Sequence, residues 1–307
     1  MYDRGKRMSD PLIRTRGLRV RYGRTEVLRG VDLEVRAGEV FALLGPNGAG
    51  KTTTAEVLEG FRRRSAGEVT VLGTDPEHGD EAWRGRIGVV LQDWRDHPRW
   101  RVRRLVAHLA EFHARPRDPD ELLDALGLTG QADQPIGTLS GGQRRRLDVA
   151  LGILGRPDLL FLDEPTTGFD PEARREFHGL VERLAREQGM TVVLTTHDLA
   201  EAERLADRIA VLVGGRVAVQ GTQEELAAHA AASSRVRWIE DGVPRSARTS
   251  DPSGLAWELH RRLGGPVPGL EIRRPSLEET YLGLVAGAGH AHDTVESARN
   301  TVERSAA

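Results

Sequence analysis

The stretch Gly45-Pro46-Asn47-Gly48-Ala49-Gly50-Lys51-Thr52-Thr53 has four residues between its outer glycines and then Lys and Thr, the pattern of a phosphate-binding loop. The apolar run before it, residues 40–44, predicts a strand, and residues 54–58 predict the start of a helix. Glycines let backbone N–H groups surround a triphosphate, and a helix N-terminus adds partial positive charge. We expect Lys51 to reach the outer phosphates and Thr52 to ligate Mg²⁺. A glycine-rich turn without a ligand is the alternative.

Composition favours a soluble globular protein of about two domains, since 307 residues exceed the roughly 150 of one domain. No apolar run approaches the roughly 18 residues of a membrane span. Residues 1–10 are charged, so we expect no secretory signal. The chain has no cysteine, which excludes disulfides and thiolate metal sites. A net charge of -2 gives no general attraction to nucleic acid or anionic lipid.

Two kinds of strand pattern follow one another along the first two thirds of the chain. Residues 12–36 alternate apolar and polar side chains, which predicts half-solvated antiparallel strands. The near-continuous apolar runs at 40–44, 159–162 and 191–195 predict strands buried on both faces of a parallel sheet. Residues 118–154 have helical spacing, so a helical insertion is expected to interrupt that parallel sheet. The fold class is therefore α/β.

The character of the chain changes after about Ala232. A hairpin with an Asp241-Gly242 turn, a helix over 255–263, an extended segment over 270–274 and a helix over 276–285 predict a small α+β domain. Residues 287–307 are polar and are expected to be disordered. We interpret His290 and His292 in this tail as incidental rather than as metal ligands. We detect no internal repeat.

Two further motifs carry chemistry. The apolar run 159–162 ends in Asp163, which can hold Mg²⁺ directly or through water, and Glu164, which can polarise the attacking water as a general base. The alternative is a strand end with two solvated carboxylates. In 139–143, Ser140 can cap the following helix while Gly141 and Gly142 expose backbone donors. This is a second anion-binding helix N-terminus.

Together these residues resemble the ATPase subunit of an ATP-binding-cassette (ABC) transporter, whose signature motif matches 139–143 letter for letter. The resemblance covers residues 12 to about 230. It implies a P-loop NTPase fold, the ABC nucleotide-binding domain, with a parallel-sheet core, an N-terminal antiparallel β subdomain and a helical subdomain. The expected boundaries are a tail at 1–11, this domain at 12–231 with the helical subdomain at about 93–155, the small domain at 232–286, and a tail at 287–307.

The resemblance also assigns roles to residues outside these motifs. Tyr22 matches the aromatic residue that stacks on adenine, and Gln92 the glutamine that touches Mg²⁺ and water and senses the membrane partner. Asp170 matches the acid of the D-loop, with Phe169 before it where leucine is commoner, and His197 matches the switch histidine at the γ-phosphate. Three of these residues have a structural alternative. Tyr22 could be a core tyrosine, Gln92 a surface amide and His197 a strand-end histidine.

The expected site residues fall into four sets. The nucleotide-binding set is Tyr22, Gly45, Pro46, Asn47, Gly48, Ala49, Gly50, Lys51, Thr52 and Thr53. The catalytic set is Lys51, Gln92, Glu164 and His197, and the Mg²⁺ set is Thr52, Gln92 and Asp163. The set supplied in trans is Ser140, Gly141, Gly142 and Gln143, with Asp170 in the D-loop.

The resemblance implies that two copies form a head-to-tail dimer around ATP and Mg²⁺, each copy closing over the nucleotide of the other. It implies a separately encoded membrane permease as partner, and a location at the cytoplasmic face of the membrane. We expect no nucleic-acid partner. Residues 38–44 and 274–282 resemble bacterial exporter ATPases of the daunorubicin-resistance kind, which favours export of a drug, antibiotic or lipid over import.

Three alternatives remain open at this level. Residues 94–104 interleave Trp94 and Trp100 with arginines, which suits a nucleic-acid patch, a solvated loop or, as we favour from the family, docking on the permease. A non-transport ABC ATPase of DNA repair, chromosomes or ribosomes is an alternative function. An inactive ATP-binding subunit is another, but Glu164 and His197 are both in place, so we expect activity.

Overall fold

A computed structural model of the chain describes residues 11–92, 97–226, 234–273, 278–279 and 281–282. The chain divides into two units, Met1–Val217 and Ala218–Ala307. The domain boundary predicted at 231/232 lies outside the described residues and stays a prediction. The predicted tail after 287 and its two histidines also lie outside them. Of the helix predicted over 276–285, residues 278–279 and 281–282 are described, and all four are helical.

A six-stranded sheet with the order β5-β6-β7-β3-β8-β9 forms the centre of the fold. The pairs β5/β6, β6/β7, β7/β3 and β3/β8 are all parallel. Every residue of β3, β6 and β7 is buried, which explains why their sequences are continuous apolar runs. The strands are β3 (Val40–Leu44), β5 (Ile87–Val90), β6 (Leu159–Asp163), β7 (Thr191–Thr196), β8 (Arg208–Val213) and β9 (Arg216–Gly221).

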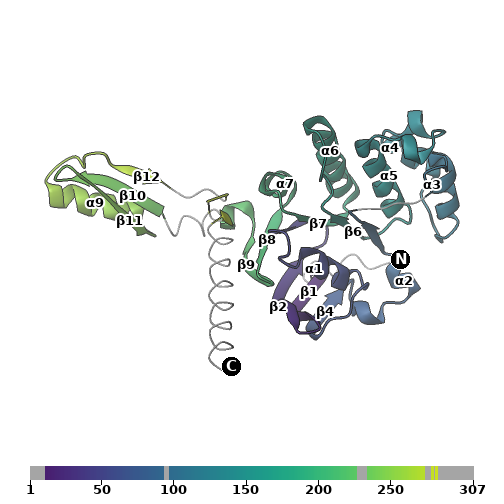
Figure 1. Cartoon of the computed structure of the whole chain (residues 1–307), viewed down its shortest axis with the longest axis horizontal. Coiled ribbons are helices and arrows are strands. Elements are labelled where there is room, and N and C mark those ends of the chain that lie inside the picture. Colours follow the sequence, from purple (N-terminus) through teal and green to yellow (C-terminus); the bar gives the residue numbers. More distant parts are fainter. Residues whose placement is uncertain (1–10, 93–96, 227–233, 274–277, 280, 283–307) are drawn as a thin grey trace, which may run out of the picture. The chain divides into compact units, whose positions relative to one another are not determined.

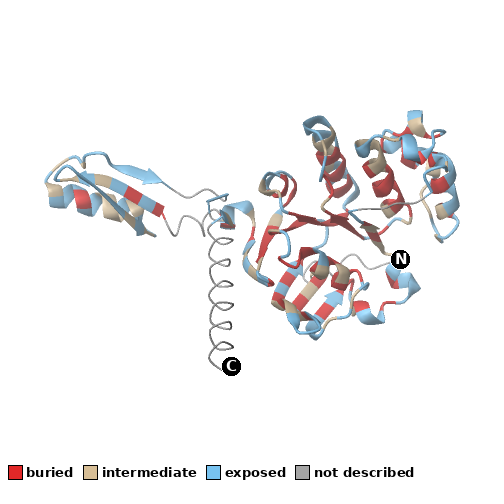
Figure 2. Cartoon of the chain, viewed as in Figure 1, coloured by how far each residue is buried: buried red, intermediate tan, exposed pale blue. Residues whose placement is uncertain are grey.

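Helices cover both faces of this sheet. Figure 1 shows α5, α6 and α7 on one face and α1, with the antiparallel strands, on the other. Buried side chains concentrate in the sheet and on the helix faces turned toward it (Figure 2). The helices of the larger unit are α1 (Lys51–Leu58), α2 (Glu81–Arg84), α3 (Val102–Ala110), α4 (Pro119–Ala125), α5 (Gly141–Ile153), α6 (Pro171–Gln188) and α7 (Leu199–Leu205).

The predicted antiparallel strands are confirmed as β1 (Ile13–Tyr22) and β2 (Thr25–Val35). A third strand, β4 (Ala66–Val71), pairs with the other edge of β1, a partner that the local pattern did not indicate. The inward side chains of these strands are fully buried, including Ile13, Leu18 and Val31. They pack with the P-loop helix, so the core of the antiparallel sheet is continuous with that of the central sheet.

The helical insertion predicted between the parallel strands is confirmed, because α3, α4 and α5 all lie between β5 and β6 in the chain. Short 3₁₀ turns, η1 (Pro76–His78), η2 (Thr129–Gln131) and η3 (Ile136–Thr138), connect the elements of the larger unit. Asp118 caps α4 by accepting hydrogen bonds from the backbone N–H groups of Asp120 and Glu121. The buried leucines of α4, Leu122 and Leu123, complete the core of this part.

The smaller unit contains a three-stranded antiparallel sheet of order β11-β10-β12 and a helix that packs on it. Its elements are β10 (Ser234–Glu240), β11 (Val243–Thr249), α9 (Pro252–Leu263) and β12 (Glu271–Arg273). Asp241 and Gly242 both have positive φ, as the two-residue hairpin turn requires. Val236 and Leu259 are buried where α9 packs on β10. The predicted small α+β fold is therefore present.

Candidate functional site

The predicted nucleotide residues meet at one edge of the central sheet because their strands are parallel neighbours. Gly45 follows β3, Glu164 follows β6, His197 follows β7 and Gln92 lies two residues beyond β5. The carboxyl ends of parallel strands lie at the same edge, where α/β proteins usually bind ligands. The backbone N–H of Gly45 donates to the carbonyl of Thr196 at 3.2 Å, which ties the loop to β7.

The glycines of the phosphate-loop motif are required by close packing. A Cβ on Gly45 would lie 2.3 Å from the carbonyl oxygen of Leu212. Gly50 has φ 103°, and a Cβ there would lie 2.5 Å from the Leu28 side chain. Gly50 is also the N-cap of α1, and no side chain caps this helix. The first backbone N–H groups of α1 are therefore available to an anion.

Lys51 is almost fully buried at 5% exposure, and its ammonium lies beneath the loop. The Nζ atom donates to the carbonyl oxygens of Gly45 at 2.9 Å and Pro46 at 3.2 Å. It also lies 3.4 Å from Glu164 Oε1. A phosphate group entering the loop would compete with this carboxylate for the ammonium.

A hollow of about 460 Å³ opens in front of the loop, and we call it the P-loop hollow. It contains most of the predicted nucleotide residues and adds Val27, which the sequence pattern did not indicate. Its lining residues are Tyr22, Val27, Asn47, Gly48, Gly50, Lys51, Thr52, Thr53, Gln92 and Glu164. Its position over the uncapped start of α1 makes it the candidate site for the phosphates.

The two acids after β6 are held by threonine and histidine. Thr52 donates its hydroxyl to Asp163 Oδ2 at 3.5 Å, and Thr195 donates its hydroxyl to Asp163 Oδ1. The Glu164 carboxylate lies 3.3 Å from His197 Nδ1 and accepts a hydrogen bond from Thr167. Asp163 therefore contacts Thr52, which lines the hollow, while Glu164 lies between Lys51 and His197.

Tyr22 is 42% exposed, so it is not a core tyrosine. Its hydroxyl lies 3.4 Å from Thr53 Oγ1, and the Arg62 guanidinium lies 4.7 Å from the ring centroid. A base could stack on this ring only on a face that Arg62 leaves open, or by displacing Arg62. Stacking of adenine on Tyr22 remains a prediction.

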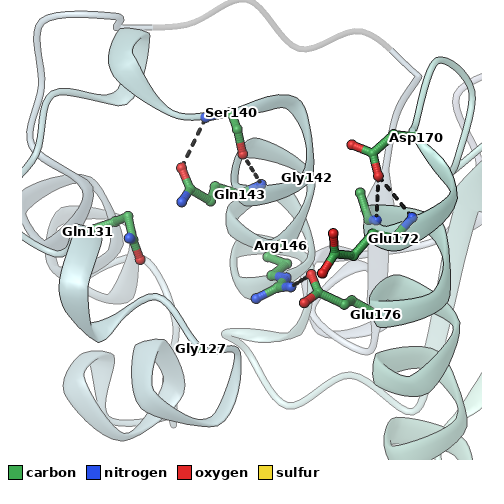
Figure 3. A pocket seen from close by; sticks show the side chains of 10 residues that line it. Gly127, Gln131, Ser140, Gly142, Gln143, Arg146, Asp170, Glu172 and Glu176 are labelled. Atoms are coloured by element: carbon green, nitrogen blue, oxygen red, sulfur yellow. Dashed lines mark hydrogen bonds and ion pairs between the residues drawn. The ribbon is translucent and has the colours of Figure 1, made fainter.

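A second hollow, of about 340 Å³, lies at the N-terminus of α5, and we call it the signature hollow. Figure 3 shows Ser140 and Gln143 from α5 on one side and Asp170 and Glu172 from the start of α6 on the other. Arg146 forms an ion pair with Glu176 at its floor. The lining residues are Gly127, Gln131, Ser140, Gly142, Gln143, Arg146, Asp170, Glu172, Ala173 and Glu176.

Ser140 caps α5 as predicted, within a reciprocal capping box. Its hydroxyl accepts from the Gln143 N–H at 3.3 Å, and its own N–H donates to Gln143 Oε1 at 3.0 Å. A Cβ on Gly142 would lie 3.3 Å from Ala173, whereas Gly141 faces open space. Asp170 caps α6 by accepting hydrogen bonds from the N–H groups of Glu172 and Ala173.

The structure therefore brings the predicted residues together in two groups rather than one. Tyr22, Gln92, Glu164 and the loop residues other than Gly45, Pro46 and Ala49 line the P-loop hollow, with Asp163 and His197 in contact with them. Ser140, Gly142, Gln143 and Asp170 line the signature hollow. In the part of the chain that the structure describes, no residue lines both hollows.

The structure also shows important residues that sequence analysis missed. Thr195 supports both acids, since its hydroxyl donates to Asp163 and accepts from the N–H of Glu164. Arg145 is buried, and its guanidinium donates to the backbone carbonyl oxygens of Asp163 and Pro165, on either side of Glu164. An arginine in the mainly apolar inner face of α5 is a sequence signal that could have indicated an unusual role.

Glu59, the C-cap residue of α1, is a further buried acid at 6% exposure. Burial raises its pKa to about 8, and the nearby charges of Asp163 and Glu56 add to the rise. The Glu59 carboxyl is therefore protonated at neutral pH in the folded protein.

Comparison with related proteins identifies the family. The family profile for the ABC transporter matches residues 28–167. The chain is 38% identical over 322 residues to the daunorubicin/doxorubicin resistance ATP-binding protein of Streptomyces peucetius, covering 93% of this chain and 96% of that protein. It is 42% identical over 245 residues to the Nod factor export ATP-binding protein I of Ralstonia nicotianae, covering 77% and 75%. It is 37% identical over 283 residues to a fluoroquinolones export ATP-binding protein of Mycobacterium tuberculosis, covering 90% and 94%.

Solved structures agree with the fold. An ATP binding subunit of an ABC transporter matches with a TM-score of 0.63 at 27% identity, over 71% of this chain and 92% of that one. The ATP-binding cassette MJ1267 in its ADP conformation matches with a TM-score of 0.63 at 24% identity, over 71% and 93%. With the near full-length relatives, these matches settle the family. The chain belongs to the ABC transporter ATP-binding proteins, and it is an ATPase.

Proposed function

We propose that this ATPase powers export of a drug, an antibiotic or a lipid-like compound through a separate membrane permease. Two copies bind each other head to tail, with ATP between the P-loop hollow of one and the signature hollow of the other. Nucleotide binding closes the pair and hydrolysis reopens it, so the free energy of ATP drives a change of shape.

The observation that carries the dimer is the separation of the two hollows. Lys51 and Glu164 line one, Ser140 and Gly142 line the other, and none of the described residues lines both. Each helix N-terminus can face a phosphate, but within one chain they line different hollows. A second copy, placed in the opposite direction, brings the P-loop hollow of each chain against the signature hollow of the other. The two sites that result are equivalent, as expected of a closed dimer with two-fold symmetry.

The geometry around Glu164 supports a role in hydrolysis. Its carboxylate lies 3.4 Å from Lys51 Nζ and 3.3 Å from His197 Nδ1. When the γ-phosphate takes over Lys51, the carboxylate is free to orient and polarise the attacking water. His197 and Lys51 then stabilise the charge of the transferring phosphoryl group.

The oxygen atoms facing the P-loop hollow suit Mg²⁺ arriving with ATP. Thr52 contributes a hydroxyl and Asp163 a carboxylate oxygen on the opposite side, and Gln92 lines the same hollow. Among the described residues, no group of three His, Cys, Asp or Glu side chains could hold a metal alone. Mg²⁺ typically uses one or two protein oxygens together with phosphates and water. Bound there, it would neutralise charge on the phosphates.

Export is supported by the relatives, which are named for Nod factor export, fluoroquinolones export and daunorubicin/doxorubicin resistance. Within the described residues, no helix is long and apolar enough to cross a membrane. A permease would therefore provide the path, and the ATPase would lie against it at the cytoplasmic face. No observation favours the non-transport alternative or a nucleic-acid partner.

Part of the predicted permease contact lies within the described residues. Trp100 stacks on His97 at 4.8 Å between ring centroids, and the Arg104 guanidinium lies 5.2 Å from the Trp100 ring centroid. Aromatic and arginine side chains are common interface anchors. Trp94 and Arg95, which the sequence grouped with them, lie outside the described residues.

The test of the proposed hydrolysis is Glu164→Gln. Removing an interaction that acts in the transition state commonly costs about 10²–10³ in kcat. We expect a loss of that order, with ATP affinity retained or increased because the competing ion pair to Lys51 is weakened. Turnover of the purified chain, alone and with its permease in vesicles, measures this. Unchanged turnover of Glu164→Gln would refute the assignment.

A further inference from the structure

Arg145 is a buried cation that grips the backbone on both sides of Glu164. It belongs to α5 and is only 5% exposed. Its Nη2 donates to the carbonyl oxygen of Asp163 at 2.8 Å and its Nε to that of Pro165 at 3.1 Å. Its Nη1 donates to the carbonyl oxygen of Leu91, the residue before Gln92. One planar guanidinium thus joins the loops after β5 and β6.

Burying a cation such as Arg145 costs free energy. A buried charge is tolerated only when its hydrogen-bonding groups are satisfied, and here three backbone carbonyls accept from the guanidinium. Only arginine offers five donors in a fixed fork, which lets one side chain fix the spacing of three carbonyls. The carbonyls that it selects flank Glu164 and precede Gln92, two residues of the P-loop hollow.

The backbone of Glu164 needs such support. Glu164 has φ 41°, in the left-handed region that residues other than glycine rarely adopt. Strained conformations persist only where the surroundings hold them. The N–H of Glu164 is held by Thr195, and Arg145 holds the carbonyls of the residues immediately before and after it. The direction of the Glu164 side chain is therefore fixed from both sides.

The position of Arg145 in its helix adds a connection to the signature hollow. Ser140 and Gln143 at the start of α5 line that hollow, and Arg145 lies two residues further along. A displacement of α5 caused by a second copy and its ATP would therefore shift the carbonyls beside Glu164 and Gln92. A rigid helix that contacts both places is a physical route for such coupling.

We propose that Arg145 is the positioning residue that sets the hydrolytic geometry of Glu164 and ties it to the signature helix. The inference rests on the proposed role of Glu164 in hydrolysis. Arg145 does not touch ATP in this scheme; it acts through the backbone of the catalytic loop. A purely structural role, in which Arg145 only holds the fold together, is the competing explanation.

The test combines Arg145→Lys with Glu164→Gln. Lysine keeps the positive charge but cannot span three carbonyls, and small misplacements of reacting groups can cost about 10²-fold. We expect Arg145→Lys to lower kcat about 10- to 100-fold, with KM for ATP within about twofold of wild type. In the Glu164→Gln background, the same change should lower the single-turnover rate by less than about twofold, because residues acting as a unit are not additive.

Arg117→Lys is the matched control. Arg117 also donates to a backbone carbonyl, that of Ile153, and to Gln188, but it lines neither hollow. We expect this variant to retain wild-type kcat. Thermal unfolding of both variants, and calorimetry of ATP binding, establish that Arg145→Lys is folded and binds nucleotide.

Three results would overturn the proposal. One is wild-type kcat in folded Arg145→Lys. Another is the same fold-loss with and without Glu164→Gln, which would show that Arg145 acts independently of Glu164. The third is an equal loss in Arg117→Lys. If Glu164→Gln alone leaves turnover unchanged, the proposed function itself fails, and that result is distinct from these three.

Discussion

Helices α1 and α5 each present an N-terminus to a hollow, but only one of these ends is left open. α1 begins after Gly50 without a side-chain cap, whereas Ser140 and Gln143 close a capping box at the start of α5. The P-loop hollow contains Lys51, while the signature hollow carries three carboxylates, Asp170, Glu172 and Glu176, beside one arginine. We infer from this difference that α1 can attract ATP unaided, and that α5 is suited to complete a site already occupied.

We expect the largest effect from removing the cation of each hollow, which tests the difference between the two hollows. We expect Lys51→Ala to weaken ATP binding about 10²- to 10³-fold, since losing one partner of a buried charge contact costs about 2–5 kcal/mol. Arg146→Ala, in the signature hollow, should leave the affinity of the isolated chain within about twofold. Calorimetry with ATP and Mg²⁺ measures both. Equal weakening by the two variants would contradict the distinction.

The two helices also differ at their C-terminal ends. The C-cap residue of α1 is the buried acid Glu59, whereas that of α5 is Leu154. Burial, with Asp163 and Glu56, raises the pKa of Glu59 to about 8, whereas an unfolded glutamate titrates near about 4.3. At pH values between these two, the folded state keeps the Glu59 proton that the unfolded state has released. The stability that this proton contributes is therefore complete below about pH 4 and is lost as the pH rises toward about 8.

We expect the free energy of unfolding of the wild type, relative to Glu59→Gln, to fall by about 2–3 kcal/mol between pH 5 and pH 7. Urea unfolding of the nucleotide-free, Mg²⁺-free protein measures the difference. Glu187→Gln, an exposed acid on α6, serves as the control and should show no such slope. Parallel pH profiles for Glu59→Gln and wild type would contradict a protonated Glu59.

We expect smaller effects on stability and turnover from a substitution at Ser140, in the signature hollow. Ser140→Ala removes the cap and should cost about 1 kcal/mol of stability. ATP affinity of the isolated chain should stay within about twofold, while turnover of the assembled pair falls by about tenfold. Ser140→Asn restores the cap and separates the two effects. Weaker ATP binding by an isolated Ser140→Ala chain would contradict this account, because it would mean that Ser140 contacts the nucleotide bound by its own chain.

Much of the central sheet could be predicted because the signal is local. The apolar run at 40–44 became β3 with the same bounds, and those at 159–162 and 191–195 became β6 and β7 with one more residue each. Burial on both faces removes the polar alternation that would blur such runs. The Ser140 cap was predictable for the same reason, since its partner Gln143 is three residues away.

The rest depends on contacts between distant residues, which local patterns do not encode. Arg145 meets Leu91 54 residues away, and Thr195 meets Asp163 32 residues away. β4 joins the antiparallel sheet by pairing with β1, although most of its own side chains are exposed. The pKa of Glu59 likewise reflects burial that only the assembled fold creates.

The most direct test of the shared site uses the absence of cysteine from this chain. Asn47→Cys in the P-loop hollow and Gly141→Cys, whose new Cβ meets open space, are combined in Glu164→Gln and treated with a short bis-maleimide. We predict covalent dimers that form with ATP and Mg²⁺ and not without nucleotide. Cross-links confined within single chains, or dimers formed equally without ATP, would contradict the account.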